Sequence, residues 1–66
     1  MTLRDFILLL PPGSNVEIRV ADVDECDNII HEVLYDGIAL YYPRDFDDCE
    51  PYHIEAIRKN HIRIDF

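Results

Sequence analysis

Apolar residues recur at helical spacing near the start of the chain. Between Leu3 and Leu10, apolar side chains fall at positions i, i+3, i+4 and i+7, which places them on one face of a helix. Thr2, with Asp5 three residues later, favours an N-terminal cap of the capping-box kind. Pro11 is expected to end this helix, because the residue before a proline disfavours helical backbone angles.

The next segments alternate with the period of a strand. Apolar and polar residues alternate over Val16–Val20, which predicts a strand with one wet face. Ala21–Asn28 breaks the alternation and carries four acids, so we expect a loop there. Ile29–Tyr35 resumes β character, because it is rich in Ile, Val and Tyr. Asp36-Gly37 is a typical hairpin turn and is predicted to end that strand.

The second half of the chain predicts a further hairpin. Ile38–Tyr42 is expected either to form a second arm after the turn or to fold over the sheet. The acidic segment Pro43–Glu50 could form one helical turn that inserts Phe46 into the core. His53–Arg58 and His61–Phe66 then predict two strands joined by a short turn.

These elements predict an α+β fold, with one short N-terminal helix packed on a mostly antiparallel sheet of four to five short strands. The 66 residues correspond to a single domain, residues 1–66. A chain of this size buries only about 60% of its unfolded surface, so a large internal active-site cavity is not expected. No apolar run approaches the roughly 20 residues of a membrane span. With no secretory signal pattern either, the sequence predicts a cytoplasmic protein with reduced thiols.

Charge is unevenly distributed along this chain. The net charge is −8, and between Ala21 and Ile57 eleven acids accompany a single base, Arg44. Such a balance argues against direct binding to nucleic-acid backbones or anionic membranes. It is compatible with a basic partner such as a nucleic-acid-binding protein. The alternative is that the acids only keep the protein soluble.

Most of these acids lie in two clusters along the chain, a first acidic cluster at Asp22–Asp27 and a second at Asp45–Glu50. Alternate residues of an extended strand lie about 6.8 Å apart, a spacing similar to that of neighbouring phosphates. Rows of carboxylates could therefore mimic a nucleic-acid backbone. Tyrosine is frequent at interfaces, and two adjacent tyrosines cannot both face the core of a strand. The candidate partner-binding residues are Asp22, Asp24, Glu25, Asp27, Asp45, Asp47, Asp48, Glu50, Tyr41 and Tyr42.

Metal binding is the alternative chemistry that the residue types suggest. Counted from Asp22, a calcium-binding EF-hand loop fails at its third acid, its glycine and its final glutamate. Cys26, His31, Cys49 and His53 could supply four zinc ligands, although the spacing is unlike that of standard small zinc sites. We expect no metal and no other cofactor. The sequence contains no nucleophile elbow, phosphate-binding glycine loop or metalloprotease motif, so we also expect no enzymatic activity.

The order of these pieces resembles a group of known proteins. Thr2–Phe6 opens a short helix, Val16–Val20 follows as a strand, and Val33–Gly37 leads into a turn and an acidic stretch. His53–Ile57 and His61–Ile64 then close the chain. In this arrangement the chain is similar to small phage and prophage proteins of Gram-positive bacteria. Several acidic phage proteins of this size and class are anti-CRISPR inhibitors that mimic nucleic acid.

The first functional hypothesis is therefore a phage-type inhibitor that binds a basic surface of a host nucleic-acid-processing protein. A CRISPR effector is the specific partner that the resemblance implies. The alternative is a structural or assembly module that self-associates, for example as a homodimer, through a sheet face or edge. A domain that binds metal through cysteine and histidine is the third hypothesis.

Overall fold

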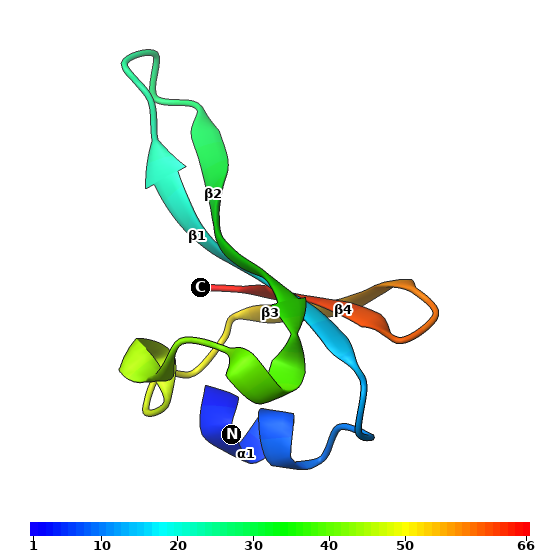
Figure 1. The fold of residues 1–66 in the computed structure, drawn as a ribbon. Helices are drawn as coiled ribbons and strands as arrows, with labels where there is room; N and C mark the ends of the chain where they lie inside the picture. Colours follow the sequence, from blue (N-terminus) through cyan, green and yellow to red (C-terminus); the bar gives the residue numbers. More distant parts are fainter.

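The computed structural model describes all 66 residues (Figure 1). One α-helix, two short 3-10 helices and four strands follow one another along the chain. Their bounds are α1 (Leu3–Leu8), β1 (Asn15–Val23), β2 (Ile29–Ile38), η1 (Ala39–Tyr41), η2 (Arg44–Phe46), β3 (His53–Arg58) and β4 (His61–Asp65).

Helix α1 begins at the cap that the sequence predicts. The Thr2 hydroxyl accepts a hydrogen bond from the backbone N–H of Asp5, and the Asp5 carboxylate accepts one from the backbone N–H of Thr2. This reciprocal capping box satisfies two amide donors that the first turn leaves unpaired. The helix ends at Leu8, before Pro11. No helix in this structure has the length and apolar character needed to cross a membrane.

The four strands form one mixed sheet in the order β2-β1-β4-β3. β1 pairs antiparallel with β2 and parallel with β4, and β3 pairs antiparallel with β4. The expected α+β fold, with a short N-terminal helix and a mostly antiparallel sheet, is therefore confirmed. The parallel pair places the C-terminal strand at the centre of the sheet, beside a strand that begins 46 residues earlier, since Asn15 is paired with His61.

The core is small and lies between the sheet and the helical segments. Leu3 from α1 packs with Val16 and Ile18 of β1 and with Ile64 of β4, and all four are fully buried. Figure 1 shows the helical segments gathered on one side of the sheet.

The expected helical turn in the acidic segment is present as η2, and Phe46 packs against the core. Its ring stacks on that of Phe66 at a centroid separation of 5.3 Å.

The predicted turn at Asp36-Gly37 is wrong. Both residues lie within β2, where they pair with Glu17 and Val16 of β1. Gly37 instead makes room for an aromatic ring, because a Cβ at this position would lie 3.1 Å from the Tyr35 hydroxyl. After the strand the chain folds over the sheet, which is the second of the two alternatives for Ile38–Tyr42.

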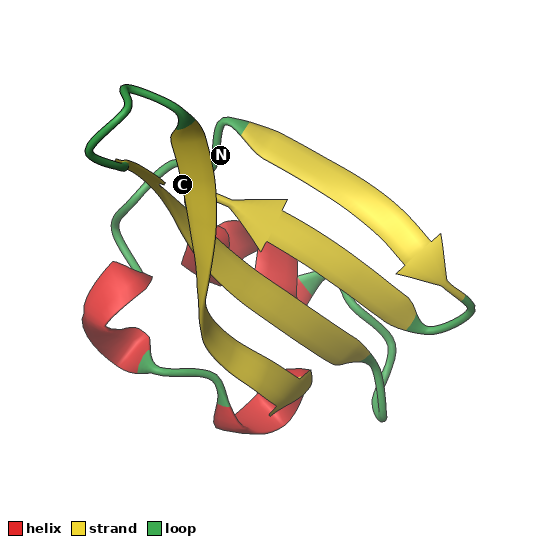
Figure 2. Cartoon of the chain, turned by 90° about the horizontal axis from the view of Figure 1, so that it is seen from above, coloured by secondary structure: helices red, strands yellow, loops and turns green.

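The real hairpin turn lies inside the segment Ala21–Asn28, which was expected to be entirely loop. β1 continues to Val23, and the chain reverses between Asp24 and Asn28. The β1–β2 hairpin projects beyond the core, as Figures 1 and 2 show. The Cα radius of gyration is 12.1 Å, compared with about 10.8 Å for a compact chain of this length. The projecting part of the hairpin therefore has no core to cover it.

Ile18 and Ile29 allow a matched test of where the core ends. We expect Ile18→Ala to lower the free energy of unfolding by about 3 kcal/mol, because it opens a cavity in the buried core. The same change at the exposed Ile29 should cost less than about 1 kcal/mol, through strand propensity alone. Urea denaturation followed by circular dichroism measures both values. Equal losses for the two variants would contradict the placement of the core.

Candidate functional site

The first acidic cluster forms the tip of the projecting hairpin. The Asp24 carboxylate accepts hydrogen bonds from the backbone N–H groups of Cys26 at 2.8 Å and Asn28 at 2.9 Å. These bonds to Asn28 and Cys26 hold the pKa of Asp24 below its usual value, because they favour the ionised form. Asp27 adopts a positive φ of 60°, which short acidic side chains tolerate. Asp24 therefore shapes the turn that presents its neighbours.

The other acids of the tip are available to a partner. Asp22, Glu25 and Asp27 are exposed, and no cationic group of the chain lies within 4 Å of their carboxylates. These exposed carboxylates keep their hydration. Together they concentrate negative potential at one end of the molecule.

Apolar side chains lie directly behind this acidic tip. Ile29 is 72% exposed and Val33 is 51% exposed. Val23, Ile30 and Leu34 are also exposed, so apolar groups lie on both faces of the hairpin. Single exposed apolar residues are ordinary, whereas several on one projecting element indicate an interaction surface.

The second acidic cluster lies elsewhere, beside α1 and η2 (Figure 1). Asp47 accepts a hydrogen bond from the hydroxyl of Tyr42. Burial, together with this hydrogen bond from the phenol to a carboxylate, raises the pKa of Tyr42. Glu50 pairs with the N-terminal ammonium at 3.3 Å, while Asp45 and Asp48 have no cationic partner within 4 Å. The two clusters thus form separate surfaces.

The adjacent tyrosines have opposite environments, as their spacing predicts. Tyr41 is 71% exposed, whereas Tyr42 is 3% exposed and belongs to the core. The Arg44 guanidinium donates a hydrogen bond to the Tyr42 hydroxyl at 3.0 Å and lies 4.5 Å from the centre of its ring. Tyr41 therefore offers a partner a whole aromatic ring, and Tyr42 offers almost none.

The cysteines and histidines considered as zinc ligands lie on different elements. Cys26 lies at the hairpin tip, and Cys49 follows η2, where its carbonyl accepts a hydrogen bond from Leu3. His31 lies on β2 and His53 on β3, the two opposite edges of the sheet. The structure contains no group of three or more His, Cys, Asp or Glu side chains placed to hold a metal ion.

The face of the sheet opposite the core carries a network of ion pairs. Arg63 binds Glu17 at 2.7 Å and Glu55 at 3.3 Å. Arg19 binds Asp65 at 2.7 Å, and the Asp65 side chain is only 3% exposed. Two of the six lysines and arginines therefore pair with acids on the sheet, and this leaves the loops more acidic than the whole chain.

All three histidines face carboxylates on this same surface. His61 lies 3.0 Å from Asp36, His53 lies 3.7 Å from Glu55 and His31 lies 4.0 Å from Asp65. Sequence reasoning missed the pairs of His61 and His31 because strand pairing brings their residues together. His53 and Glu55, in contrast, lie two residues apart on one face of β3. The alternation of charge in β1 and β4 was the one signal that this face would be polar.

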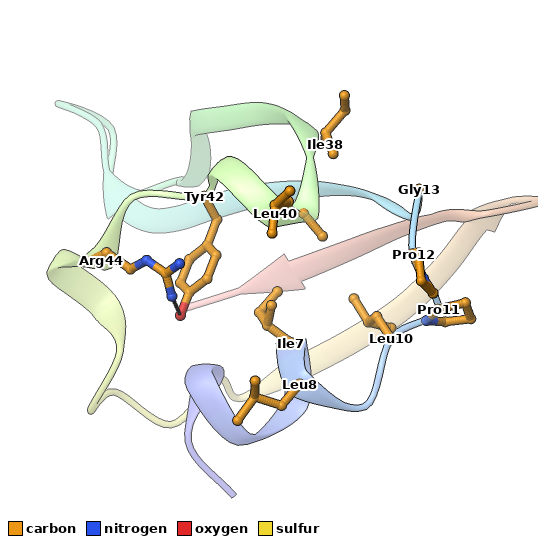
Figure 3. Close-up of a pocket in the computed structure, with 11 residues that line it drawn as sticks. Ile7, Leu8, Leu10, Pro11, Pro12, Gly13, Ile38, Leu40, Tyr42 and Arg44 are labelled. Atoms are coloured by element: carbon orange, nitrogen blue, oxygen red, sulfur yellow. Dashed lines mark hydrogen bonds between the residues drawn. The ribbon is translucent and has the colours of Figure 1, made fainter.

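A groove of about 340 Å³ opens between α1 and the segment that follows β2 (Figure 3). Its walls are mostly apolar and include Leu8 and Leu40, whose side chains are largely exposed. Arg44, beside Tyr42, is the one charged residue that lines it. The groove lies on the helical side of the sheet and is separate from the ion pairs.

Comparisons with protein-family models, curated proteins and solved structures gave no match for this chain. The resemblance to phage inhibitors therefore stays a prediction.

Asp65 predicts how stability depends on pH. The hydrogen bond from Arg19 holds the pKa of Asp65 below its usual value, so the folded state favours the carboxylate. The stabilisation that the Asp65 carboxylate gives the folded state is complete above about pH 5. It is lost as the pH falls below the unfolded-state pKa of about 3.9 towards the lower folded-state pKa. Asp65→Asn should lower the free energy of unfolding at pH 7 by about 1–2 kcal/mol and flatten the acid limb.

Urea denaturation between pH 3 and pH 7 measures both effects. Asp48→Asn is the matched control, because Asp48 has no cation within 4 Å. An acid limb that is equally steep in wild type and Asp65→Asn would show that this ion pair does not govern acid stability.

Proposed function

We propose that the protein is a binding domain without catalytic activity, and that its β1–β2 hairpin docks on a basic surface of a nucleic-acid-processing protein. The observation that carries this proposal is the combination of exposed apolar side chains with acids that have no cationic partner, on one projecting element. A surface that served solubility alone would not need the apolar groups.

The two kinds of group have different roles in such a contact. Carboxylates at the tip raise the rate of encounter with a basic surface and exclude acidic partners. Apolar side chains such as Ile29 and Val33 supply affinity, because their burial removes apolar area from water. The acids should therefore control how strongly binding depends on salt concentration, and the apolar groups should control the lifetime of the complex.

A CRISPR effector is the specific target that the resemblance to phage inhibitors suggests. Such proteins hold nucleic acid in a positively charged channel. The hairpin would occupy part of that channel, and this proposal places its action in the cytoplasm of a bacterial host.

Neutralising the tip should strongly reduce capture of such a partner. In a pull-down from lysate of a CRISPR-bearing bacterial host, the wild type should retain a nucleic-acid-binding protein at low salt and lose it at high salt. The variant Asp22→Asn, Glu25→Gln, Asp27→Asn should retain at least about tenfold less, because it loses three charges of the tip. Mass spectrometry identifies the retained protein.

The control removes the same number of charges from the second cluster, through Asp45→Asn, Asp48→Asn and Glu50→Gln. Its capture should match the wild type within about twofold. If the tip variant captured the partner as well as the control did, the acidic tip would not be the contact surface. Recovery of this protein alone would point instead to self-assembly.

A further inference from the structure

β2 forms one edge of the sheet, and part of its backbone faces solvent. The backbone N–H of Asp24 donates a hydrogen bond to the carbonyl of Asn28. The next pair along the ladder, Val23 with Ile29, is therefore one whose two residues do not hydrogen-bond to each other. Pairs of the two kinds alternate along an antiparallel ladder. The N–H and C=O groups of Ile29, His31 and Val33 therefore point away from β1, towards the open edge.

The outer half of β2 carries few of the devices that usually protect an edge strand. Ile29–Leu34 contains no proline and no lysine, and its pairing with β1 is regular up to the bulge at Leu34. Four of these six residues are large, apolar and exposed. Such an edge is a template for another strand, because it offers unpaired backbone groups together with apolar surface.

Charge selects what kind of strand fits this edge. Glu32 lies within the segment, acids crowd the tip, and no lysine or arginine occurs between Val20 and Tyr42. A second copy paired antiparallel would place its acidic tip beside Asp36, and one paired parallel would place tip beside tip. Like charges at such positions destabilise strand pairing, so a basic strand fits better than another copy of this chain.

The two faces of the edge also differ. Ile29, His31 and Val33 point to the face that carries the ion pairs, and Ile30, Glu32 and Leu34 point to the other. An added strand would therefore place a basic side chain opposite Glu32. Its alternate residues would lie beside Ile29 and Val33, where apolar side chains fit.

We propose that the Ile29–Leu34 edge of β2 accepts an extended basic segment of a partner protein as a fifth strand of the sheet. Main-chain hydrogen bonds to the open edge would supply affinity, and the apolar and acidic side chains would supply selectivity. This inference rests on the proposed function, in which the hairpin is the contact surface, and it specifies the form of the partner.

A synthetic peptide tests this geometry directly. The probe is a capped seven-residue peptide of alternating lysine and valine, used at concentrations where it is monomeric. We expect it to bind, and at saturation we expect hydrogen exchange at the amides of Ile29, His31 and Val33 to slow at least about tenfold, measured by NMR. The same peptide with every backbone nitrogen methylated keeps its charge but has no backbone N–H donors, and it should bind at least about tenfold more weakly.

Variants with a matched charge change locate the binding edge. Glu32→Lys should weaken binding of the lysine–valine peptide at least about tenfold, because it places a cation opposite the cations of the peptide. Asp45→Lys makes the same change on the second acidic cluster and should weaken binding by less than about threefold. Both variants change exposed side chains, so folding of each is checked by circular dichroism.

Several results would overturn the inference. Equal binding of the methylated peptide, no binding of either peptide, or unchanged amide exchange would exclude strand addition at this edge. The occupant would instead be a second copy of the chain if sedimentation showed a dimer without peptide and NMR showed protection of the same amides in that dimer. If strand addition were excluded by any of the three peptide results, salt-sensitive capture of a basic protein in the pull-down would still support the proposed function. Failure of the strand-addition proposal can therefore be distinguished from failure of the proposed function.

Discussion

The parallel pairing of β1 with β4 holds this fold together. It places Ile18 beside Ile64 in the core and Arg19 beside Asp65 on the opposite face. Parallel neighbours need a long connection, and here that connection contains β2, both 3-10 helices and β3. One pairing thus decides where the core, the ion pairs and both hairpins lie.

The small core has a direct consequence for the surface. α1 has only six residues, which is fewer than two turns. The buried core side chains of β1 end at Ile18, although the strand continues to Val23. Beyond Val20 most side chains of the hairpin are exposed, and several of them are apolar. A short chain has little apolar surface to spare, since its margin of stability is thin. The strand addition proposed for the edge of β2 would cover part of the apolar surface that lies outside the core.

The strand order also determines where the charged side chains lie. Arg19 and Arg63 form ion pairs on the outer face of the sheet, where their partners come from neighbouring strands. Most of the acids without a cationic partner lie in two loops, and the hairpin tip adjoins a group of exposed apolar side chains on β1 and β2. In the proposed contact, the acids of the tip would supply long-range attraction to a basic surface, and the apolar side chains would hold that surface at short range.

The sequence by itself determined the local elements. The capping box at Thr2, the alternation in β1 and the closing hairpin of β3 and β4 depend on residues within a few positions of one another, and all three are confirmed. The Asp36-Gly37 turn failed, although it is equally local. Asp-Gly suits a turn, but extended pairing with Glu17 and Val16 of β1 holds these residues in the strand.

Only the tertiary structure decided the strand order, the separation of the two acidic clusters, and the pairing of His31 with Asp65 and of His61 with Asp36. The acids of both clusters were candidates from the sequence, but it could not place one cluster next to exposed apolar groups. The exposed edge of β2 was also hidden in the sequence. These features depend on contacts such as Arg19 with Asp65, 46 residues apart. Local propensity carries no information about such contacts, because they form only when distant strands pair.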